Sequence, residues 1–200
     1  MNYNKMYTQL FSNANYSKHG YTEPRYIFAN ENIDRFSANN IIDIGSGRGV
    51  LLELIKKTHP NIRLVSTDLQ KFHNIDCEFI NLDLTNKNTY FYPAQKFDLL
   101  MCLDVLEHLD KCYITQVFEW FAEISKYQVL SIANHSEIIN GIELHTIQEN
   151  IDYWISLINK KSNVLSRKEL VFISQPDEMP NIKIPHYLYI LTTESKNYEK

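Results

Sequence analysis

The sequence predicts an α/β protein in which helices cover both faces of a mostly parallel sheet. Short apolar runs rich in β-branched residues alternate along the chain with segments of helical periodicity, the order expected of parallel strands. The run at 97–103, FDLLMCL, is almost continuously apolar, as strands buried on both faces are. Two final apolar runs, at 164–173 and 186–192, follow one another without a helix and close the sheet as a pair of strands.

Length and composition favour one globular domain over residues 1–200. The chain has 200 residues, of which 44% are hydrophobic and 22% charged, so it is long enough to bury a substantial core. We expect an N-terminal lid or helical segment at 1–38 and a ligand-binding core at 39–200. The formal net charge of −4 gives no overall basic field, so neither nucleic acid nor a membrane surface is an expected partner.

The cysteines and the absence of long apolar segments bear on the cellular compartment. Cys77, Cys102 and Cys112 are odd in number and lie in or beside apolar stretches, which predicts buried free thiols in a reducing compartment. The first residues lack a signal-peptide core, and no apolar run approaches the roughly 18 residues needed to span a bilayer. We therefore expect a soluble, cytoplasmic monomer or homodimer.

The first half of the chain contains three predicted strands. Residues 1–23 are polar and tyrosine-rich, and two interpretations remain open: a mobile terminus, or a lid over a ligand cleft. Pro24 begins a helix that runs to about residue 39. Strands follow at 41–44, 62–67 and 77–80, and a helix lies between the first two of them, starting near Val50 and stopped by Pro60.

The second half continues the alternation of strands and helices. After the strand at 97–103, periodic apolar residues predict a helix at 110–126, then a strand at 128–133. Residues 138–146 are expected to form a loop around Gly141, followed by a helix at 147–160 and the two closing strands. Prolines between those strands indicate a long loop.

The segment Ile41–Leu54 organises the chain, because its buried strand leads into Gly45, Gly47 and Gly49 and then into a helix. Glycines permit a sharp turn and close approach of a ligand to the backbone and the helix N-terminus. The segment lacks the Gly-Lys-Ser/Thr ending of a P-loop, and its third glycine falls one residue too early for the dinucleotide fingerprint. Asp43, just before the loop, would repel a pyrophosphate but suits a cationic ligand.

The pattern D-x-G-x-G-x-G resembles motif I of the class I S-adenosylmethionine (SAM) methyltransferases. The segment CLDVLEHL at 102–109 resembles the fourth-strand motif of the methyltransferases that act on small molecules, the type 11 or quinone-biosynthesis-like group. The resemblance spans about residues 39–136. It implies SAM as cofactor and a Rossmann-like, seven-stranded sheet whose last strand is antiparallel and lies between the fifth and sixth.

The resemblance also implies a set of cofactor-binding residues. Asp68 follows the glycine loop by about 20 residues, where an acidic side chain receives ribose hydroxyls, and Asp83 would meet the adenine amino group. Either aspartate is alternatively a turn residue. The complete predicted set is Asp43, Gly45, Ser46, Gly47, Gly49, Asp68, Leu69, Asp83, Leu84 and Leu103. Arg48, at the variable loop position, is expected on the surface or beside the sheet.

The catalytic candidates follow the ends of the fourth and fifth strands. Methyl transfer requires alignment of acceptor and sulfonium, and a general base helps if the acceptor carries a proton. Glu107 and His108 come about one helical turn after Asp104, so these three are expected to reach one cleft. His135 and His145 complete the set, although His108 and His145 are alternatively structural loop residues.

We expect methyl transfer to a hydroxyl or amine of a small molecule. The motifs N-P-P-Y and D-P-P-Y and a proline-cysteine motif, typical of nucleic-acid methyltransferases, are absent from the sequence. One alternative is a metal-assisted RNA or nucleotide 2′-O-methyltransferase, because the spacing of Asp104, Glu107 and His108 resembles E-x-x-E-H. Another is a SAM-binding module without catalysis. We assign no residue as a metal ligand from the sequence.

Overall fold

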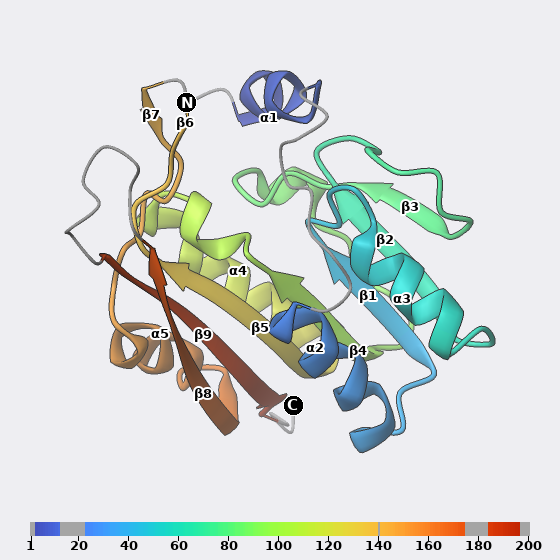
Figure 1. Ribbon diagram of the computed structural model, residues 1–200. Helices are drawn as coiled ribbons and strands as arrows, with labels where there is room; N and C mark the ends of the chain where they lie inside the picture. The colour runs from blue at the N-terminus through green and yellow to red at the C-terminus, as the bar shows by residue number, and fades with distance from the viewer. Residues whose placement is uncertain (1–2, 13–22, 140, 175–183, 197–200) are drawn as a thin grey trace.

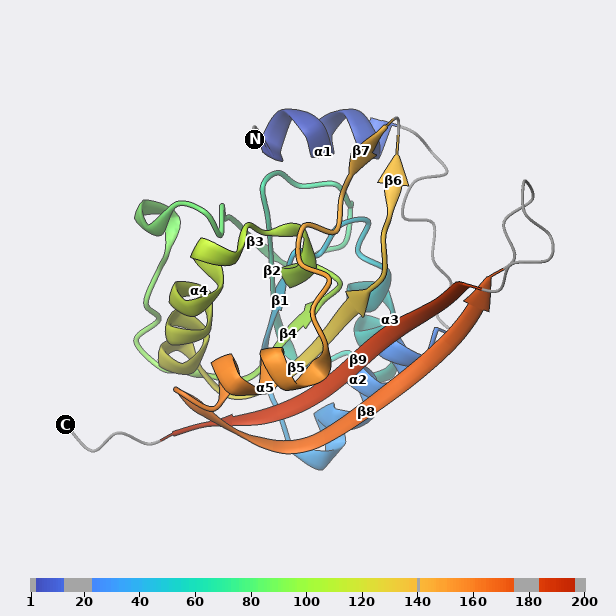
Figure 2. The same ribbon diagram turned by 90° about the vertical axis from the view of Figure 1, so that its left-hand side faces the viewer.

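The computed structural model describes residues 3–12, 23–139, 141–174 and 184–196. These residues form a twisted central sheet between two layers of helices (Figures 1 and 2). Two expectations lie outside the described residues: a lid contribution from 13–22, and the proline-marked part of the loop between the closing strands.

The sheet has seven strands in the order β3-β2-β1-β4-β5-β9-β8. Strands β1 to β5 are parallel to one another, whereas β9 is antiparallel to both of its neighbours, β5 and β8. This arrangement confirms the predicted seven-stranded sheet with its last strand placed between the fifth and sixth. The strands span β1 Asn40–Ile44, β2 Arg63–Asp68, β3 Glu78–Asn81, β4 Phe97–Leu103, β5 Ser125–Asn134, β8 Ser162–Ser174 and β9 Ile184–Ser195.

Two helices pack on each face of the sheet. Helices α2 (Pro24–Arg35) and α3 (Val50–Thr58) share a core with alternate strand residues such as Ile41 and Leu99. On the opposite face, α4 (Lys111–Ile124) and α5 (Ile151–Ile158) share a core with the strand residues that point the other way, such as Ile42 and Leu100. Because successive strand side chains point to opposite faces, the nearly continuous apolar runs serve both layers.

Helix α1 (Tyr3–Ser12) lies across the carboxyl ends of the strands, apart from both helical layers (Figures 1 and 2). The ring of Phe11 stacks on Phe72 at a centroid distance of 4.1 Å, and Arg48 Nη2 donates to the Phe11 carbonyl over 3.0 Å. Gln70 also donates a 2.9 Å hydrogen bond to Thr8. Residues 3–12 therefore lie against the segments that follow β1 and β2.

The region after β5 differs from the predicted loop and helix. A small hairpin, β6 (Ile138–Ile139) and β7 (Ile142–Glu143), replaces the loop expected at 138–146. Helix α5 begins at Ile151 and not at 147, because the Asn150 side chain accepts a hydrogen bond from Tyr153 N and caps the helix there. Two 3₁₀ turns complete the described elements, η1 (Lys87–Thr89) and η2 (Leu106–His108).

The cysteines are free, as the sequence predicts, but only one of the three is buried. Cys102 is buried in β4, Cys77 is half-buried, and Cys112 is exposed. Cys112 is the second residue of α4, between the exposed Lys111 and the half-buried Tyr113, so it lies outside the apolar stripe of that helix. Within the described ranges, no helix is both long enough and apolar enough to cross a bilayer.

Candidate active site

The glycine loop between β1 and α3 adopts a backbone that ordinary side chains disfavour. Gly45, Gly47 and Gly49 have φ values of +71°, +50° and +76°. A Cβ atom on Gly45 would lie 2.4 Å from Val105 Cγ2, and one on Gly49 would lie 2.9 Å from His73 Cβ. Glycine is therefore required at both positions by backbone conformation and by packing.

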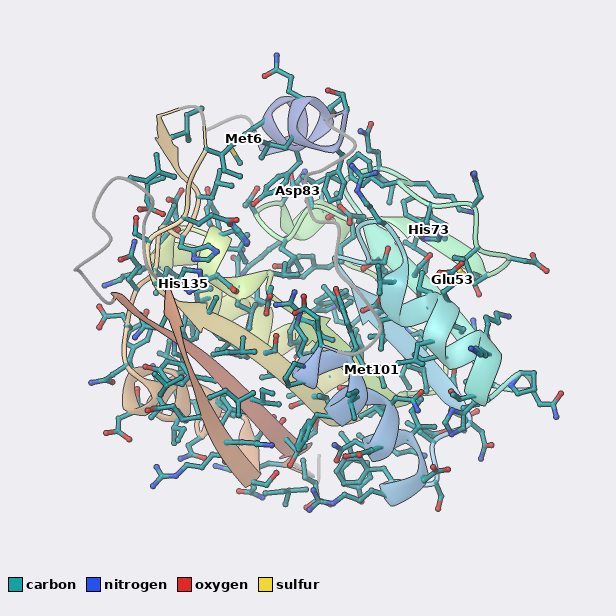
Figure 3. All side chains as sticks on the ribbon, in the orientation of Figure 1. Met6, Glu53, His73, Asp83, Met101 and His135 are labelled. Atoms are coloured by element: carbon teal, nitrogen blue, oxygen red, sulfur yellow. The ribbon has the colours of Figure 1, made fainter. Side chains whose placement is uncertain are left out.

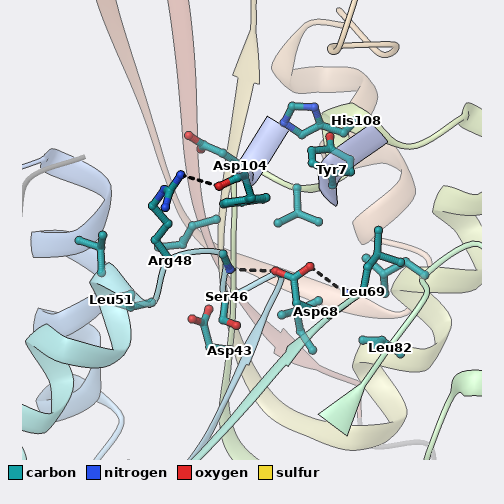
Figure 4. A pocket seen from close by; sticks show the side chains of 18 of the residues that line it. Tyr7, Asp43, Ser46, Arg48, Leu51, Asp68, Leu69, Leu82, Asp104 and His108 are labelled. Atoms are coloured by element: carbon teal, nitrogen blue, oxygen red, sulfur yellow. Dashed lines mark hydrogen bonds between the residues drawn. The ribbon is translucent and has the colours of Figure 1, made fainter. Parts of the chain in front are cut away.

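Asp68, at the end of β2, holds this loop in place. Its Oδ2 atom accepts a 2.8 Å hydrogen bond from Gly47 N, and its Oδ1 atom accepts a 2.7 Å bond from Leu69 N (Figure 4). Burial raises the pKa of the carboxyl to about 6, against the opposing effect of these two bonds. The predicted ribose acceptor is thus also the residue that orders the glycine loop.

Asp43 is a buried carboxyl directed toward the same loop (Figure 4). Only 4% of the residue is exposed, and burial, followed by repulsion from Asp68, raises its pKa well above the ordinary range. Among the described residues, none forms an ion pair with it. A buried carboxyl of this kind is stabilised as the anion by a neighbouring cation, so the site suits a positively charged ligand.

These residues line an open cleft at the carboxyl ends of β1, β2 and β4. All of the predicted cofactor residues line it except Gly49, which packs against His73 instead. Asp83 also stabilises the turn that follows it, because its Oδ1 atom accepts hydrogen bonds from the backbone N–H and the hydroxyl of Thr85. The Leu84 carbonyl accepts a 2.7 Å bond from the Tyr90 hydroxyl.

Asp104 and His108 lie on the opposite side of the cleft, together with Tyr7 of α1 (Figure 4). Asp104 has a φ of +55° at the end of β4 and is held by two partners. The Arg25 guanidinium of α2 forms an ion pair with it, and the Ser131 hydroxyl of β5 donates to its Oδ1 atom. The Asp104 carboxylate is therefore fixed in position by β5 and α2.

Glu107 does not reach this cleft, which corrects the expectation that it would share one with Asp104 and His108. Asp104 has a left-handed backbone and is followed by the short η2 turn, and this path of the chain leaves Glu107 inside the protein. Glu107 has no exposed surface, and its Oε1 atom accepts a 2.8 Å bond from Ala133 N. Burial, with repulsion from Asp104, raises the pKa of Glu107 to about 8.

The structure brings three histidines together beside Glu107. The rings of His108 and His145 have centroids 4.7 Å apart, and those of His135 and His145 are 4.8 Å apart. His145 is buried, with Nδ1 at 2.7 Å from the His135 carbonyl and Nε2 at 3.2 Å from Glu137 Oε2. His135 follows β5 (Figure 3), and neither His135 nor His145 lines the main cleft.

A family model described as a methyltransferase domain matches residues 21–173. The chain belongs to this methyltransferase family. Together with the strand order, the match confirms the class I SAM-dependent methyltransferase family to which the sequence motifs pointed, with SAM as its cofactor. Among proteins of curated function, none matches the chain.

Solved structures share the fold of this methyltransferase at low sequence identity. A SAM-dependent methyltransferase from Anabaena variabilis has 11% identity, covering 98% of this chain and 96% of that chain, with a TM-score of 0.67. The N-methyltransferase NodS from Bradyrhizobium japonicum, solved with S-adenosyl-L-homocysteine, has 14% identity, covering 98% and 100%, with a TM-score of 0.64. The methyltransferase domain of a bacterial Hen1 has 16% identity, covering 84% and 97%, with a TM-score of 0.53.

Several residues around the cleft of the methyltransferase are not predicted from the sequence. Arg48 was expected on the surface or beside the sheet, but it lines the cleft, with its guanidinium 5.4 Å from the Phe11 ring centroid. Tyr7, Phe11 and Arg25 also line it. Their approach depends on contacts between distant segments, and the tyrosine-rich composition before Pro24 is the only local signal of it.

Proposed function

We propose that the chain transfers a methyl group from SAM to a hydroxyl or amine of a small molecule. The observation that carries this proposal is a single cleft with two chemically different sides. Asp43, Asp68 and the glycine loop form one side, and Tyr7 and His108 belong to the other. Both sides face one shared space, in which a donor and an acceptor can lie next to each other.

The first side suits the donor. In our proposal Asp43 attracts the positively charged end of SAM, Asp68 accepts from the ribose hydroxyls, and Asp83 with Leu84 borders the adenine. When bound, SAM would supply an electrophilic methyl group to the acceptor, with S-adenosylhomocysteine as the leaving group, and the acceptor proton would pass to a base. The residues of the chain align the two reactants and exclude water.

The second side suits an acceptor that must lose a proton. Burial, and then repulsion from His145, lowers the pKa of His108 to about 4, so its ring is neutral near pH 7. Nδ1 lies 3.1 Å from the Leu144 carbonyl, which can only accept, so Nδ1 carries the proton and Nε2 has a free lone pair. Tyr7, whose ring centroid is 5.8 Å from that of His108, covers this side from α1.

We further propose one methyltransferase domain over 1–200, with residues 1–38 supplying the cover of the cleft. The net charge of −4 supports a small-molecule acceptor over a polynucleotide. An acceptor side that holds His108 and Tyr7 supports an enzyme over a module that only binds SAM. Free thiols, one of them exposed, support a cytoplasmic location.

The first test is calorimetric titration of the purified chain with SAM and S-adenosylhomocysteine. Asp68→Asn removes a carboxylate oxygen that orders the glycine loop, and Asp76→Asn changes an exposed aspartate after the same strand as a matched control. We expect binding by the wild type and by Asp76→Asn, and an affinity at least about tenfold weaker in Asp68→Asn. Well-folded protein that binds neither compound would contradict the proposal. Binding without turnover over a broad set of hydroxyl and amine acceptors would favour the binding module.

A further inference from the structure

Glu107, His108 and His145 present the donor atoms of a metal site. One ligand atom of each lies within 4.8 Å of those of the other two. Two imidazole nitrogens and a carboxylate oxygen form a donor set used by zinc and other first-row transition metals. An ion about 2.1 Å from each ligand atom requires these atoms to lie within about 4.2 Å of one another, so the cluster needs only a small closure.

An unpartnered oxygen gives independent support for a bound cation. Glu107 Oε2 is buried and has no hydrogen-bond partner among the described residues, although Glu107 Oε1 accepts from Ala133 N. Buried carboxylate oxygens are normally satisfied, because leaving one without a partner is costly. Glu107 offers one carboxylate oxygen to the cluster with the two histidines, and a cation there would satisfy the unpartnered side of this carboxylate.

The hydrogen bonds of the two histidines leave suitable nitrogens for an ion. His108 and His145 each direct Nδ1 toward a backbone carbonyl, that of Leu144 and that of His135 respectively. Metal-binding histidines commonly donate one ring N–H in this way, which orients the ring and leaves the other nitrogen for the metal. The Nε2 atom of His145 lies 3.2 Å from Glu137 Oε2, so a second carboxylate is close at hand.

The backbone around the cluster is ordered by the protein itself. Ile147 N donates a 3.1 Å bond to the Glu107 carbonyl, and the Thr146 hydroxyl donates a 2.6 Å bond to the Leu109 carbonyl. These bonds hold the segment after β7 against η2 and thereby bring His145 to Glu107. Asp104, by contrast, is held by Arg25 and Ser131 and is not part of the cluster.

We infer that Glu107, His108 and His145 bind a divalent transition-metal ion in the wall of the acceptor side of the cleft. Three protein ligands leave further coordination positions open. Since His108 lines the cleft, an open position facing it suits an oxygen of a hydroxyl acceptor, whose deprotonation a Lewis acid favours. The inference that the acceptor is a hydroxyl and not an amine rests on the proposed function. The metal site itself does not.

The test is metal binding by the purified full chain after treatment with a chelator. We expect one equivalent of Co²⁺ to bind and give a visible absorption spectrum, Zn²⁺ to displace it, and excess Mg²⁺ not to do so. Glu107→Gln keeps the size of the side chain and an acceptor for Ala133 N but loses the anionic ligand. We expect it to weaken Co²⁺ binding at least about tenfold, as removal of a ligand should.

Control variants separate a metal site from general damage to the fold. His59→Asn alters a histidine that also pairs with a carboxylate, that of Asp34, but lies after α3 at the amino ends of the strands. Its Co²⁺ affinity should stay within about twofold of the wild type, because distant sites act independently. If Glu107→Gln does not fold, His145→Gln tests the same ligand set. Thermal unfolding shows whether each of the two variants is folded.

Three outcomes would overturn the inference: no stoichiometric Co²⁺ or Zn²⁺ binding by folded wild type, unchanged affinity in both cluster variants, or displacement of Co²⁺ by Mg²⁺. The cluster would then be held by the ion pair between the buried His145 and the partly exposed Glu137. Titration of the same preparation with S-adenosylhomocysteine tests the proposed function separately. Addition of catechol, a bidentate oxygen ligand, should change the Co²⁺ spectrum, and an unchanged spectrum would contradict the hydroxyl-acceptor step.

Discussion

Two glycines with nearly the same backbone differ in what surrounds them. Gly45, in the cofactor loop, has a φ of +71°, and Gly141, at the tip of the β6–β7 hairpin, has a φ of +75°. A Cβ atom on Gly141 would meet no atom of the described residues within 4 Å, whereas one on Gly45 would overlap Val105. The pair therefore separates the cost of the left-handed backbone from the cost of close packing.

We predict that Gly45→Ala destabilises the protein more than Gly141→Ala. Both variants incur the left-handed penalty of about 1–2 kcal/mol, but only Gly45→Ala must also displace Val105 or the loop. Urea unfolding of the two variants and the wild type measures the difference. Equal losses of unfolding free energy would show that the loop accommodates the added Cβ atom at no energetic cost, which would contradict the close packing of Gly45 against Val105.

The raised pKa of Asp68 predicts a pH dependence of stability. The folded-state value of about 6 exceeds the unfolded value of about 3.9, so the folded protein binds this proton more tightly between these two pH values. The contribution of Asp68 to stability is therefore present below about pH 4 and is lost as the pH rises to about 6. The unfolding free energy of the wild type minus that of Asp68→Asn should fall across this window. Parallel curves for the two proteins would refute the assignment.

At the residue scale, sequence reasoning succeeded where position follows from the end of a strand. Asp43, Asp68 and Leu103 lie at the carboxyl ends of parallel strands, which meet at one edge of the sheet, so spacing alone places them in the cleft. It failed at Glu107, because the left-handed Asp104 and the 3₁₀ turn after it have no signature in the residue types. The meeting of Glu107 with His145, 38 positions later, required the tertiary structure.

At the scale of elements, aromatic and polar contacts join α1 to the core. Phe11 stacks on Phe72 with ring centroids 4.1 Å apart and also lies 3.4 Å from the position of a Cβ on Gly47. A short helix over a ligand cleft is expected to open and close with ligand exchange.

We predict that Phe11→Ala accelerates dissociation of S-adenosylhomocysteine by about two- to tenfold, because one aromatic contact of roughly 0.5–1.5 kcal/mol is lost. Stopped-flow displacement measures the rate. Phe36→Ala is the matched control, because Phe36 stacks on Tyr127 at 4.2 Å but lies after α2, outside the cleft. It should lower stability and leave the dissociation rate unchanged. The same rate in Phe11→Ala and the wild type would show that α1 does not control release.

The elements themselves were predictable where burial dictates them. The continuous apolar run of β4 and the periodic stripe of α4 appear in the structure within two residues of their predicted ends. The β6–β7 hairpin was not predicted, because side-chain bonds stabilise its short pairing. The Glu143 carboxylate accepts hydrogen bonds from the backbone N–H groups of Glu137 and His145. No periodicity in the sequence reports bonds of this kind.

At the scale of the whole molecule, the cleft is assembled from distant parts of the chain. Its lining runs from Tyr7 to Leu109 and includes the ends of β1, β2 and β4. Strand β4 pairs with β5, which pairs with β9, so the cofactor side and the closing strands belong to one continuous sheet. The core that contains Trp120 and Trp154 packs on that same sheet. Opening the cleft side therefore requires disruption of contacts that reach the C-terminal strands.

This continuity predicts one cooperative thermal transition that shifts as a whole when the cofactor product binds. At a S-adenosylhomocysteine concentration of about 100 times Kd, ligand binding should raise the free energy of unfolding by about 2.7 kcal/mol. For a domain of this size that raises Tm by roughly 5–10 °C, at about 2–4 °C per kcal/mol. Tryptophan fluorescence and far-ultraviolet circular dichroism should report the same midpoint with and without ligand. Two midpoints, of which only one responds to the ligand, would instead divide the chain into separate folding units and contradict the proposed single domain.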